Sequence, residues 1–276
     1  MVARTAAIRA AAMGRTRMFQ IRETPGAVQA APEGRVSDDI RLYAIGDIHG
    51  SHDLLVALLQ RIAEDGATRT DWRAVRIVFL GDYVDRGDDS AGVLSVLSRL
   101  WRDQLPELVF LKGNHEAALL EFLDDPVAGR RWLAFGAVQT LASYGLGLPD
   151  RADPDTLVAL RDALVTRMGD HVDFLRKGLR ICARFGNVMT THAGLAPGYS
   201  GATADEVAMV WGHPEFLVPR PVQGVRVVHG HHDHDRPVVE PGRICVDTGA
   251  YYTGRLTAVR LDDGESFLSV SVRDLP

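Results

Sequence analysis

Hydrophobic and polar positions follow a regular rhythm from Ile40 onward. Short apolar runs that are typical of buried strands occur at 40–47 (IRLYAIGD), 75–82 (VRIVFLGD) and 107–114 (ELVFLKGN). Stretches with apolar residues at helical spacing follow each run, at 52–65, 91–103 and 115–125. Alternating strands and helices predict parallel strands joined by right-handed crossovers, with ligands beyond the carboxyl ends of the strands. The pattern predicts an α/β fold.

The second half of the chain has a different pattern. Residues 126–178 are mostly helical in periodicity, and strand pairs follow them. One predicted hairpin spans 179–194 and turns at Gly186-Asn187, and another spans 255–272 and turns at Asp263-Gly264. Two further apolar runs, VRVVHGH at 225–231 and RICVDTG at 243–249, predict strands between the hairpins.

Composition restricts the classes of protein to consider. The chain of 276 residues is 46% hydrophobic and 24% charged, which is ordinary for a globular domain. A net charge of −5 gives no basic footprint for nucleic acid, and no apolar run approaches a membrane span, so we expect a cytoplasmic protein. Cys182 and Cys245 lie in apolar runs and are expected to be buried free thiols.

The first 37 residues stand apart from the rest. Arginines lie among alanines there, and no acidic residue precedes Glu23. We interpret residues 1–37 as a disordered N-terminal arm. The alternatives are an organelle transit peptide, or translation that starts at Met13 or Met18. Residues 38–276 are then expected to form one folded domain.

Polar residues that can bind metal follow the predicted strands. Carboxylate, imidazole and amide donors at one edge of a sheet suit Mn, Fe or Zn, and the absence of thiolates favours a catalytic site over a structural one. The donors follow the strands in the stretches GDIHG (Asp47, His49), GDYVDRG (Asp82, Asp85, Arg86), GNHE (Asn114, His115, Glu116) and HAG (His192), with His229 or His231 after a later strand.

These motifs, in this order, resemble those of the phosphoprotein phosphatases within the calcineurin-like metallophosphoesterases. The resemblance runs from about Leu42 to Leu261, and VDTGAYYTGRL at 246–256 is similar to a stretch of the bacterial serine/threonine protein phosphatases. It implies a central β-sandwich of two mixed sheets flanked by helices. Residues 38–276 would then be the catalytic domain, with 126–178 as a helical cap insertion.

The resemblance also implies a dinuclear metal centre, with manganese as the expected metal and iron or zinc as alternatives. Asp47 and His49 would bind the first ion and Asp82 would bridge the two. The second ion would be bound by Asn114, His192 and His231. His231 is chosen because the family places its last histidine ligand after a glycine at a strand end, here Gly230.

The histidines around His231 receive different interpretations. His229, two residues earlier on the strand, is expected to point to the same side but to lie deeper, where it would support the ligands. His232 and His234 fall beyond the strand in a loop with acidic residues and are expected to be solvated.

The implied reaction is phosphomonoester hydrolysis by a hydroxide that bridges two cations. His115 would donate a proton to the leaving alkoxide. Asp85 would hydrogen-bond to the His115 imidazole, orient it and keep it protonated. Arg86 offers a planar fork for phosphate oxygens, with Asn114 and Tyr251 as further phosphate neighbours. Glu116 is interpreted as structural, at the start of the third helix.

The substrate remains open between alternatives. A protein serine/threonine phosphatase acting on a phosphoprotein or phosphopeptide is favoured, because relatives that hydrolyse dinucleoside polyphosphates show GDLVARG and GNHD where this chain has Asp85 and Glu116. A dinucleoside-polyphosphate hydrolase and a non-catalytic phospho-binding module are the alternatives. One departure lies in VWGHPEF, where His213 occupies the place of an arginine in many bacterial members. The oligomeric state cannot be predicted.

Overall fold

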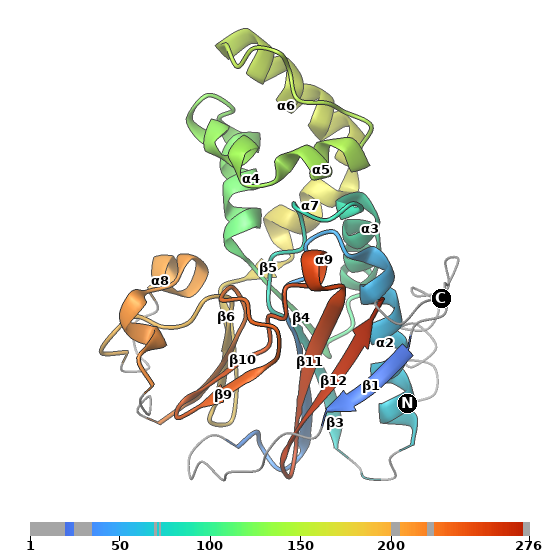
Figure 1. Ribbon diagram of the computed structural model, residues 1–276, viewed down its shortest axis with the longest axis vertical. Helices are drawn as coiled ribbons and strands as arrows, with labels where there is room; N and C mark the ends of the chain where they lie inside the picture. The colour runs from blue at the N-terminus through green and yellow to red at the C-terminus, as the bar shows by residue number, and fades with distance from the viewer. Residues whose placement is uncertain are drawn as a thin grey trace.

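A computed structural model describes residues 35–272 except 69, 70, 72, 200–204 and 220–223, together with the backbone of Gln20–Thr24. Two mixed sheets lie against each other in the lower part of the molecule, and a group of helices stands above them (Figure 1). The predicted α/β architecture, with two mixed sheets flanked by helices, is confirmed.

The larger sheet has seven strands in the order β1-β12-β11-β2-β3-β4-β5. Its strands β2 to β5 run parallel, as the alternation of strands and helices predicts, and β11, β12 and β1 are antiparallel to their neighbours. The strands are β1 (Gln20–Thr24), β2 (Ile40–Ile45), β3 (Ala74–Phe79), β4 (Leu108–Leu111), β5 (Leu179–Arg180), β11 (Arg255–Leu261) and β12 (Glu265–Ser271).

The smaller sheet has five strands in the order β6-β7-β8-β10-β9. The predicted hairpins are confirmed, because β6 pairs with β7 and β11 with β12 in antiparallel register across the expected turns. The strands β7, β8 and β10 run parallel. The strands of this sheet are β6 (Cys182–Phe185), β7 (Val188–Thr191), β8 (Arg226–His229), β9 (Val238–Glu240) and β10 (Arg243–Cys245).

Alternation along the strands divides the core into layers. On β2, Leu42 and Ala44 belong to the apolar cluster between the two sheets, together with residues of the smaller sheet such as Val228. Tyr43 and Ile45 point to the opposite face and pack against the helices. Because the larger sheet is covered on both faces, its parallel strands read as nearly continuous apolar runs.

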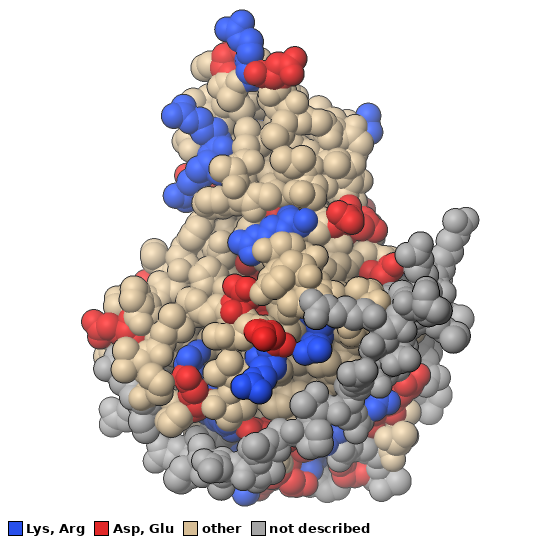
Figure 2. Space-filling view, in the orientation of Figure 1, with Lys and Arg blue, Asp and Glu red and all other residues tan. Residues whose placement is uncertain are grey.

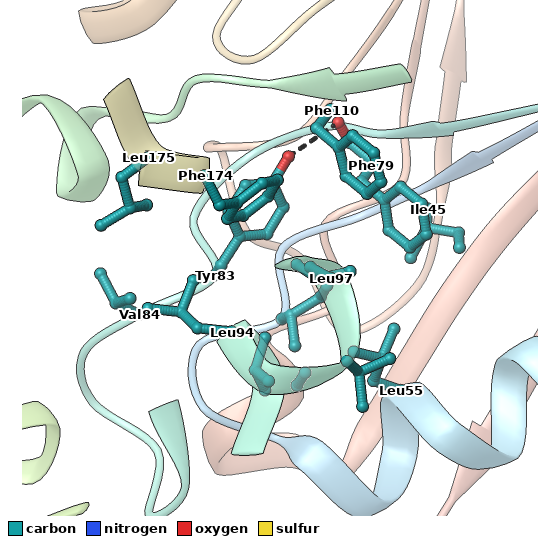
Figure 3. Packing of buried hydrophobic residues seen from close by; sticks show 14 of the residues in the cluster. Ile45, Leu55, Phe79, Tyr83, Val84, Leu94, Leu97, Phe110, Phe174 and Leu175 are labelled. Carbon is teal, nitrogen blue, oxygen red and sulfur yellow. Dashed lines mark hydrogen bonds between the residues drawn. The ribbon is translucent and has the colours of Figure 1, made fainter. Parts of the chain in front are cut away.

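The helices α2 (His52–Ala67) and α3 (Ser90–Arg102) follow the first two parallel strands and bury their apolar faces on the larger sheet. Figure 3 shows this packing around Tyr83, whose ring lies beside that of Phe174. The Tyr83 hydroxyl donates to the Leu111 carbonyl at 2.6 Å and lies 3.2 Å from the Phe79 carbonyl. This buried tyrosine ties the loop after β3 to the ends of two strands.

The helical segment after β4 projects from the sheets (Figure 1). Residues within the predicted segment 126–178 are mostly helical, and their role as a cap stays a prediction. The helices that follow β4 are α4 (Asn114–Asp124), the 3₁₀ helix η1 (Ala128–Ala134), α5 (Ala137–Ser143), α6 (Pro154–Met168) and α7 (Asp170–Lys177). Shorter helices are α8 (Glu206–Trp211), η2 (Pro214–Leu217) and α9 (Ala250–Thr253).

Part of the predicted N-terminal arm is a strand in this structure. Gln20–Thr24 form β1, paired with β12 at the edge of the larger sheet. Residues 1–19 and 25–34 lie outside the described residues, so the boundary at residue 37 stays a prediction. Both cysteines are free, as predicted, but only Cys245 is fully buried and Cys182 is half-buried.

Surface charge is mixed over the described part of the chain. On the face shown in Figure 2, basic side chains lie singly or beside acidic ones and form no continuous basic surface. None of the helices in the described ranges combines the length and apolarity that a membrane span requires. The cytoplasmic location stays a prediction.

Candidate metal centre

The side chains predicted to bind metal lie at the carboxyl ends of the strands and come together. Asp47 and His49 follow β2, and Asp82 follows β3. Asp47, His49 and Asp82 are each 2% exposed. The remaining three donors are Asn114 at the start of α4, His192 after β7 and His231 after β8. The structure thus places the six predicted ligands in one region, and their assignment to metal stays a prediction.

The backbone around these ligands is unusual in two respects. His49, Asp82 and His231 have φ values of 42°, 51° and 65°, in the left-handed region that residues with a Cβ rarely adopt. Gly113 and Gly230 allow close approach, because a Cβ added to them would lie only 2.9 Å from Asp82 Cγ and 3.0 Å from Asp47 Cγ. The chain is held in a strained form that points the ligands inward.

One group of donors surrounds Asn114. Its Oδ1 lies 3.1 Å from His192 Nε2 and 2.9 Å from His231 Nδ1, and these two nitrogens are 3.2 Å apart. His192 donates its Nδ1–H to the Leu80 carbonyl at 2.9 Å, which leaves the lone pair of Nε2 facing the group. Burial lowers the pKa of His192, and lowers that of His231 to about 3, so both rings are neutral.

A second group surrounds His49. Its Nδ1–H donates to the Val84 carbonyl at 2.8 Å, so Nε2 presents a lone pair, 3.4 Å from Asp82 Oδ2. Burial lowers the pKa of His49 to about 3. The other oxygen of Asp82, Oδ1, lies 3.4 Å from His192 Nε2. Asp82 therefore contributes one oxygen to each group, which is the placement that a bridging ligand needs.

Asp47 lies between these groups and a further acid. Its Oδ2 accepts the His231 backbone N–H at 3.0 Å, while its buried Oδ1 has no hydrogen-bond donor among the described residues. Burial and the neighbouring carboxylates of Asp247 and Asp82 raise the pKa of Asp47. Burial also raises the pKa of Asp247 to about 7. Asp247 was missed in the sequence, although it follows β10 in the VDTGAY stretch.

These residues fit a pair of cations. The buried Oδ1 of Asp47 has no hydrogen-bond donor among the described residues, and the carboxyl groups of Asp82 and Asp247 lie near it. The rings of His49 and His231 are neutral, so they carry lone pairs within the same site. Each of these arrangements is unfavourable without positive charge between the groups. The donors that could hold an ion within the described residues fall into two sets, His49–Asp82–His115 and Asp82–His192–His231. Oxygen and nitrogen donors without thiolate suit Mn, Fe or Zn.

His115 belongs to the first set by distance, but its contacts differ from those of a ligand. Its Nδ1 lies 2.8 Å from Asp85 Oδ2, and its Nε2 lies 3.9 Å from Asp82 Oδ2. Burial acts to lower the pKa of His115, but Asp82 and Asp85 raise it overall. A protonated imidazole donates and does not coordinate. The predicted contact between His115 and Asp85 is present in the structure.

Arg86 and Tyr251 lie at the open side of the site. The Tyr251 ring is 5.5 Å from the His49 ring, and the Arg86 guanidinium carbon lies 5.4 Å from the Tyr251 ring centroid. Tyr251 is 41% exposed, and the neighbouring Tyr252 is 51% exposed. The Arg86 guanidinium has no ion-pair or hydrogen-bond partner among the residues that the structure describes, which leaves its donors free for an anion.

The expectations for the other histidines of the run are partly wrong. His229 is fully buried on the outer face of β8, where its Nδ1–H donates to the Gly230 carbonyl and its Nε2 accepts from Arg243 at 3.1 Å. It does not lie beneath His231 on the same side, because β8 ends at His229 and the left-handed backbone of His231 turns the chain. His232 is half-buried, with its ring 4.7 Å from that of His231, and only His234 is exposed as predicted.

Glu116 is structural, as interpreted, but it does more than suit the helix dipole. It is fully buried, and its carboxylate accepts backbone N–H groups from Asp82 and Tyr83 at 2.8 Å and from Gly113 at 3.0 Å. Burial and Asp82 raise its pKa to about 7. Glu116 thereby fixes the loop that carries Asp82 to the start of α4.

His213 caps the short helix η2 and accepts the Glu215 N–H at 3.3 Å. It therefore has a local structural contact at the position where the resemblance implies an arginine. Arg220, which could otherwise supply such a cation, lies outside the described residues.

Comparison with known proteins identifies the family to which the chain is similar. A model of the calcineurin-like phosphoesterase family matches residues 40–234. The chain is 31% identical over 166 residues to the symmetrical Bis(5'-nucleosyl)-tetraphosphatase of Dechloromonas aromatica (strain RCB), covering 60% of this chain and 48% of that protein. It is 34% identical over 95 residues to Serine/threonine-protein phosphatase 2 of Escherichia coli (strain K12), covering 34% of this chain and 38% of that protein.

A third relative is aligned over nearly its whole length. The asymmetrical Bis(5'-nucleosyl)-tetraphosphatase PrpE of Oceanobacillus iheyensis is 25% identical over 256 residues, covering 85% of this chain and 93% of that protein. The chain spans about half or less of the first two relatives. The family match covers most of this chain and includes every strand end that carries a predicted ligand. The chain therefore belongs to the calcineurin-like phosphoesterase family.

Proposed function

We propose that the chain is a phosphomonoesterase of the serine/threonine protein phosphatase type, acting on phosphoproteins or phosphopeptides. The observation that carries this proposal is the buried contact of 2.8 Å between His115 and Asp85. A protonated imidazole held in this way suits a substrate whose leaving group is a poor one, such as the alkoxide of serine or threonine.

The metal ligands would be divided between two ions. Asp47 and His49 would hold one ion, Asn114, His192 and His231 the other, and Asp82 would contact both. Bound there, the ions would neutralise phosphate oxygens and lower the pKa of water enough to supply a nucleophile at neutral pH. The protein's own part is to hold neutral imidazoles and ionised carboxylates in a buried site, which the tautomers of His49 and His192 support.

His115 would act on the leaving group. Its Nδ1 is occupied by Asp85, so its Nε2 is the atom that can give a proton to the departing oxygen. The Asp85 carboxylate would favour the charged imidazole and hold its plane, as an aspartate does behind a catalytic histidine. Nothing in this role requires His115 to touch metal.

Arg86 would bind the phosphoryl group. Its guanidinium is exposed and lies against the ring of Tyr251, near the His49 group. A planar fork can donate two hydrogen bonds to phosphate oxygens. Asn114 and Tyr251 are the proposed further contacts of the phosphate.

A dinucleoside-polyphosphate hydrolase is the second candidate. Relatives with that name align with this chain, and two exposed tyrosines, Tyr251 and Tyr252, lie beside the site with ring centroids 5.0 Å apart. Exposed aromatic rings could stack on a nucleobase. Against this candidate, the leaving group of a tetraphosphate is a stable phosphate anion that needs no proton, and the His115–Asp85 pair would then have no task.

Turnover of matched substrates would test the proposal. The manganese-loaded protein is assayed with a phosphoserine peptide, a phosphotyrosine peptide and diadenosine tetraphosphate. We expect the highest kcat/KM with the phosphoserine peptide, and His115→Asn should lower kcat for that peptide more than for p-nitrophenyl phosphate. Preference for diadenosine tetraphosphate by tenfold or more, with His115→Asn nearly as active as the wild type, would support the second candidate.

A further inference from the structure

The carboxylate of Asp85 is held by the helical segment as well as by His115. Asp85 is fully buried. Its Oδ2 accepts the Trp132 indole N–H at 2.9 Å, beside the His115 contact at 2.8 Å. Its Oδ1 accepts the Thr140 hydroxyl at 2.7 Å. Each oxygen thus has a donor from η1 or α5, which are separated in sequence from the strand ends that carry the metal ligands.

The two donors are themselves fixed in place. Trp132 is fully buried and packs on Phe122 with ring centroids 5.1 Å apart. Thr140 is also fully buried, and its oxygen accepts the Asp85 backbone N–H at 2.9 Å while lying 3.0 Å from the Ser90 hydroxyl. Thr140 therefore contacts both the backbone and the side chain of Asp85, which fixes the residue in one orientation.

The same segment supports the next residue. The Arg86 backbone N–H donates to the Gly136 carbonyl at 3.1 Å. Asp85 and Arg86 have φ values of 70° and 69°, so two successive residues occupy the left-handed region without being glycine. Such a conformation persists only where its surroundings determine it. The contacts from 132–140 are the ones that hold this turn from the helical side.

We infer that Trp132 and Thr140 are positioning residues, which act through Asp85 to set the orientation of His115. This inference rests on the proposed function, in which His115 is the proton donor. A carboxylate rotates readily about its terminal torsion, so without these donors it can leave the plane of the His115 N–H. The helical segment is thus part of the proton-donating apparatus, beyond any cover it provides.

Two substitutions that each remove one hydrogen-bond donor test the inference. Trp132→Phe removes the indole N–H and keeps an aromatic ring, and Thr140→Val removes the hydroxyl and keeps the shape. Each should lower kcat for a phosphoserine peptide about 10- to 100-fold, the range typical of groups that support catalytic residues. KM, metal content and kcat for p-nitrophenyl phosphate should change little. Thr140→Ser should restore the phosphoserine rate.

Two controls separate a positioning role from a structural one. Trp101→Phe makes the same change at a half-buried tryptophan on α3 that packs on Phe174. It should leave both rates unchanged. Combined with His115→Asn, Trp132→Phe should cause no further loss, because both changes act on one proton transfer.

The possible outcomes distinguish the inference from the function on which it rests. If His115→Asn lowers kcat equally for both substrates, or for neither, the proposed role of His115 as proton donor is wrong. If His115→Asn behaves as expected but Trp132→Phe and Thr140→Val keep the wild-type phosphoserine rate, the inference alone is overturned. If Trp132→Phe and Thr140→Val lower kcat equally for both substrates, or if their losses add to that of His115→Asn, the two residues have a structural role. Either result would also overturn the inference.

Discussion

A single methyl group at Gly113 should displace Asp82 without removing any ligand. Gly113 has φ −89° and ψ 173°, a conformation that alanine adopts without strain. A Cβ there would nevertheless lie 2.9 Å from Asp82 Cγ and closer still to its Oδ1 and its backbone nitrogen. Ordinary contacts are about 3.5–4.0 Å, so Asp82 or α4 would have to move by about 1 Å.

Two magnitudes follow from that displacement. Overpacking in a well-packed interior costs about 1–3 kcal/mol of the free energy of unfolding. A misplacement of about 1 Å at a catalytic group can lower the rate about 100-fold. Because Asp82 faces both His49 and His192, we expect Gly113→Ala to weaken binding at both metal positions.

Three measurements on Gly113→Ala check this reasoning: bound metal per chain, kcat on p-nitrophenyl phosphate, and urea unfolding of the metal-free protein. Gly66→Ala is the matched control, because Gly66 lies in α2 with no atom within 4 Å of an added Cβ. That change should raise stability by about 0.5–1 kcal/mol, as alanine does in helices. A Gly113→Ala protein with two bound metals and more than half the wild-type rate would refute the steric argument and the bridging position of Asp82.

Three further outcomes are expected. Asp82→Asn should reduce turnover to background, since it removes the charge shared by both donor groups; two bound metals with wild-type activity would contradict the dinuclear assignment. His231→Ala should lose one metal and nearly all activity, whereas His234→Ala, at the exposed position, should keep both. Burial raises the pKa of Asp247 to about 7, so the protonated side chain contributes to the stability of the metal-free protein at low pH. This contribution is lost as the pH rises from about 4 through 7. Urea unfolding at pH 5 and 8 checks this loss, which Asp247→Asn should reduce, while the raised pKa values of Asp47 and Glu116 account for a remaining loss.

The parallel part of the fold could be predicted because its signals are local. The strands β2, β3 and β4 are apolar runs. Each is followed within two residues by a glycine that precedes a polar ligand, and then by helical periodicity. Parallel strands bring their carboxyl ends to one edge, so Asp47, Asp82 and Asn114 could be brought together from sequence alone. The convergence of these side chains in the structure follows from that topology.

Side-chain direction past a strand end could not be predicted in the same way. His229 and His231 are two positions apart, which places them on one side only if the strand continues. The strand β8 ends at His229, and His231 adopts φ 65°, which a sequence pattern does not reveal for a residue other than glycine. Asp247 was missed because it is a lone acid after a short strand, and its partner Asp47 lies 200 positions earlier in the chain.

The contacts that support the site come from a part of the chain without recognisable motifs. Trp132 and Thr140 read as ordinary residues of a helical stretch, yet both donate to Asp85. A buried carboxylate without enough donors is unstable, so the GDYVDRG motif requires such partners from elsewhere in the chain. The motif therefore predicts that donors must exist, and only the folded structure can identify them, because any helix packed over the loop after β3 could supply them.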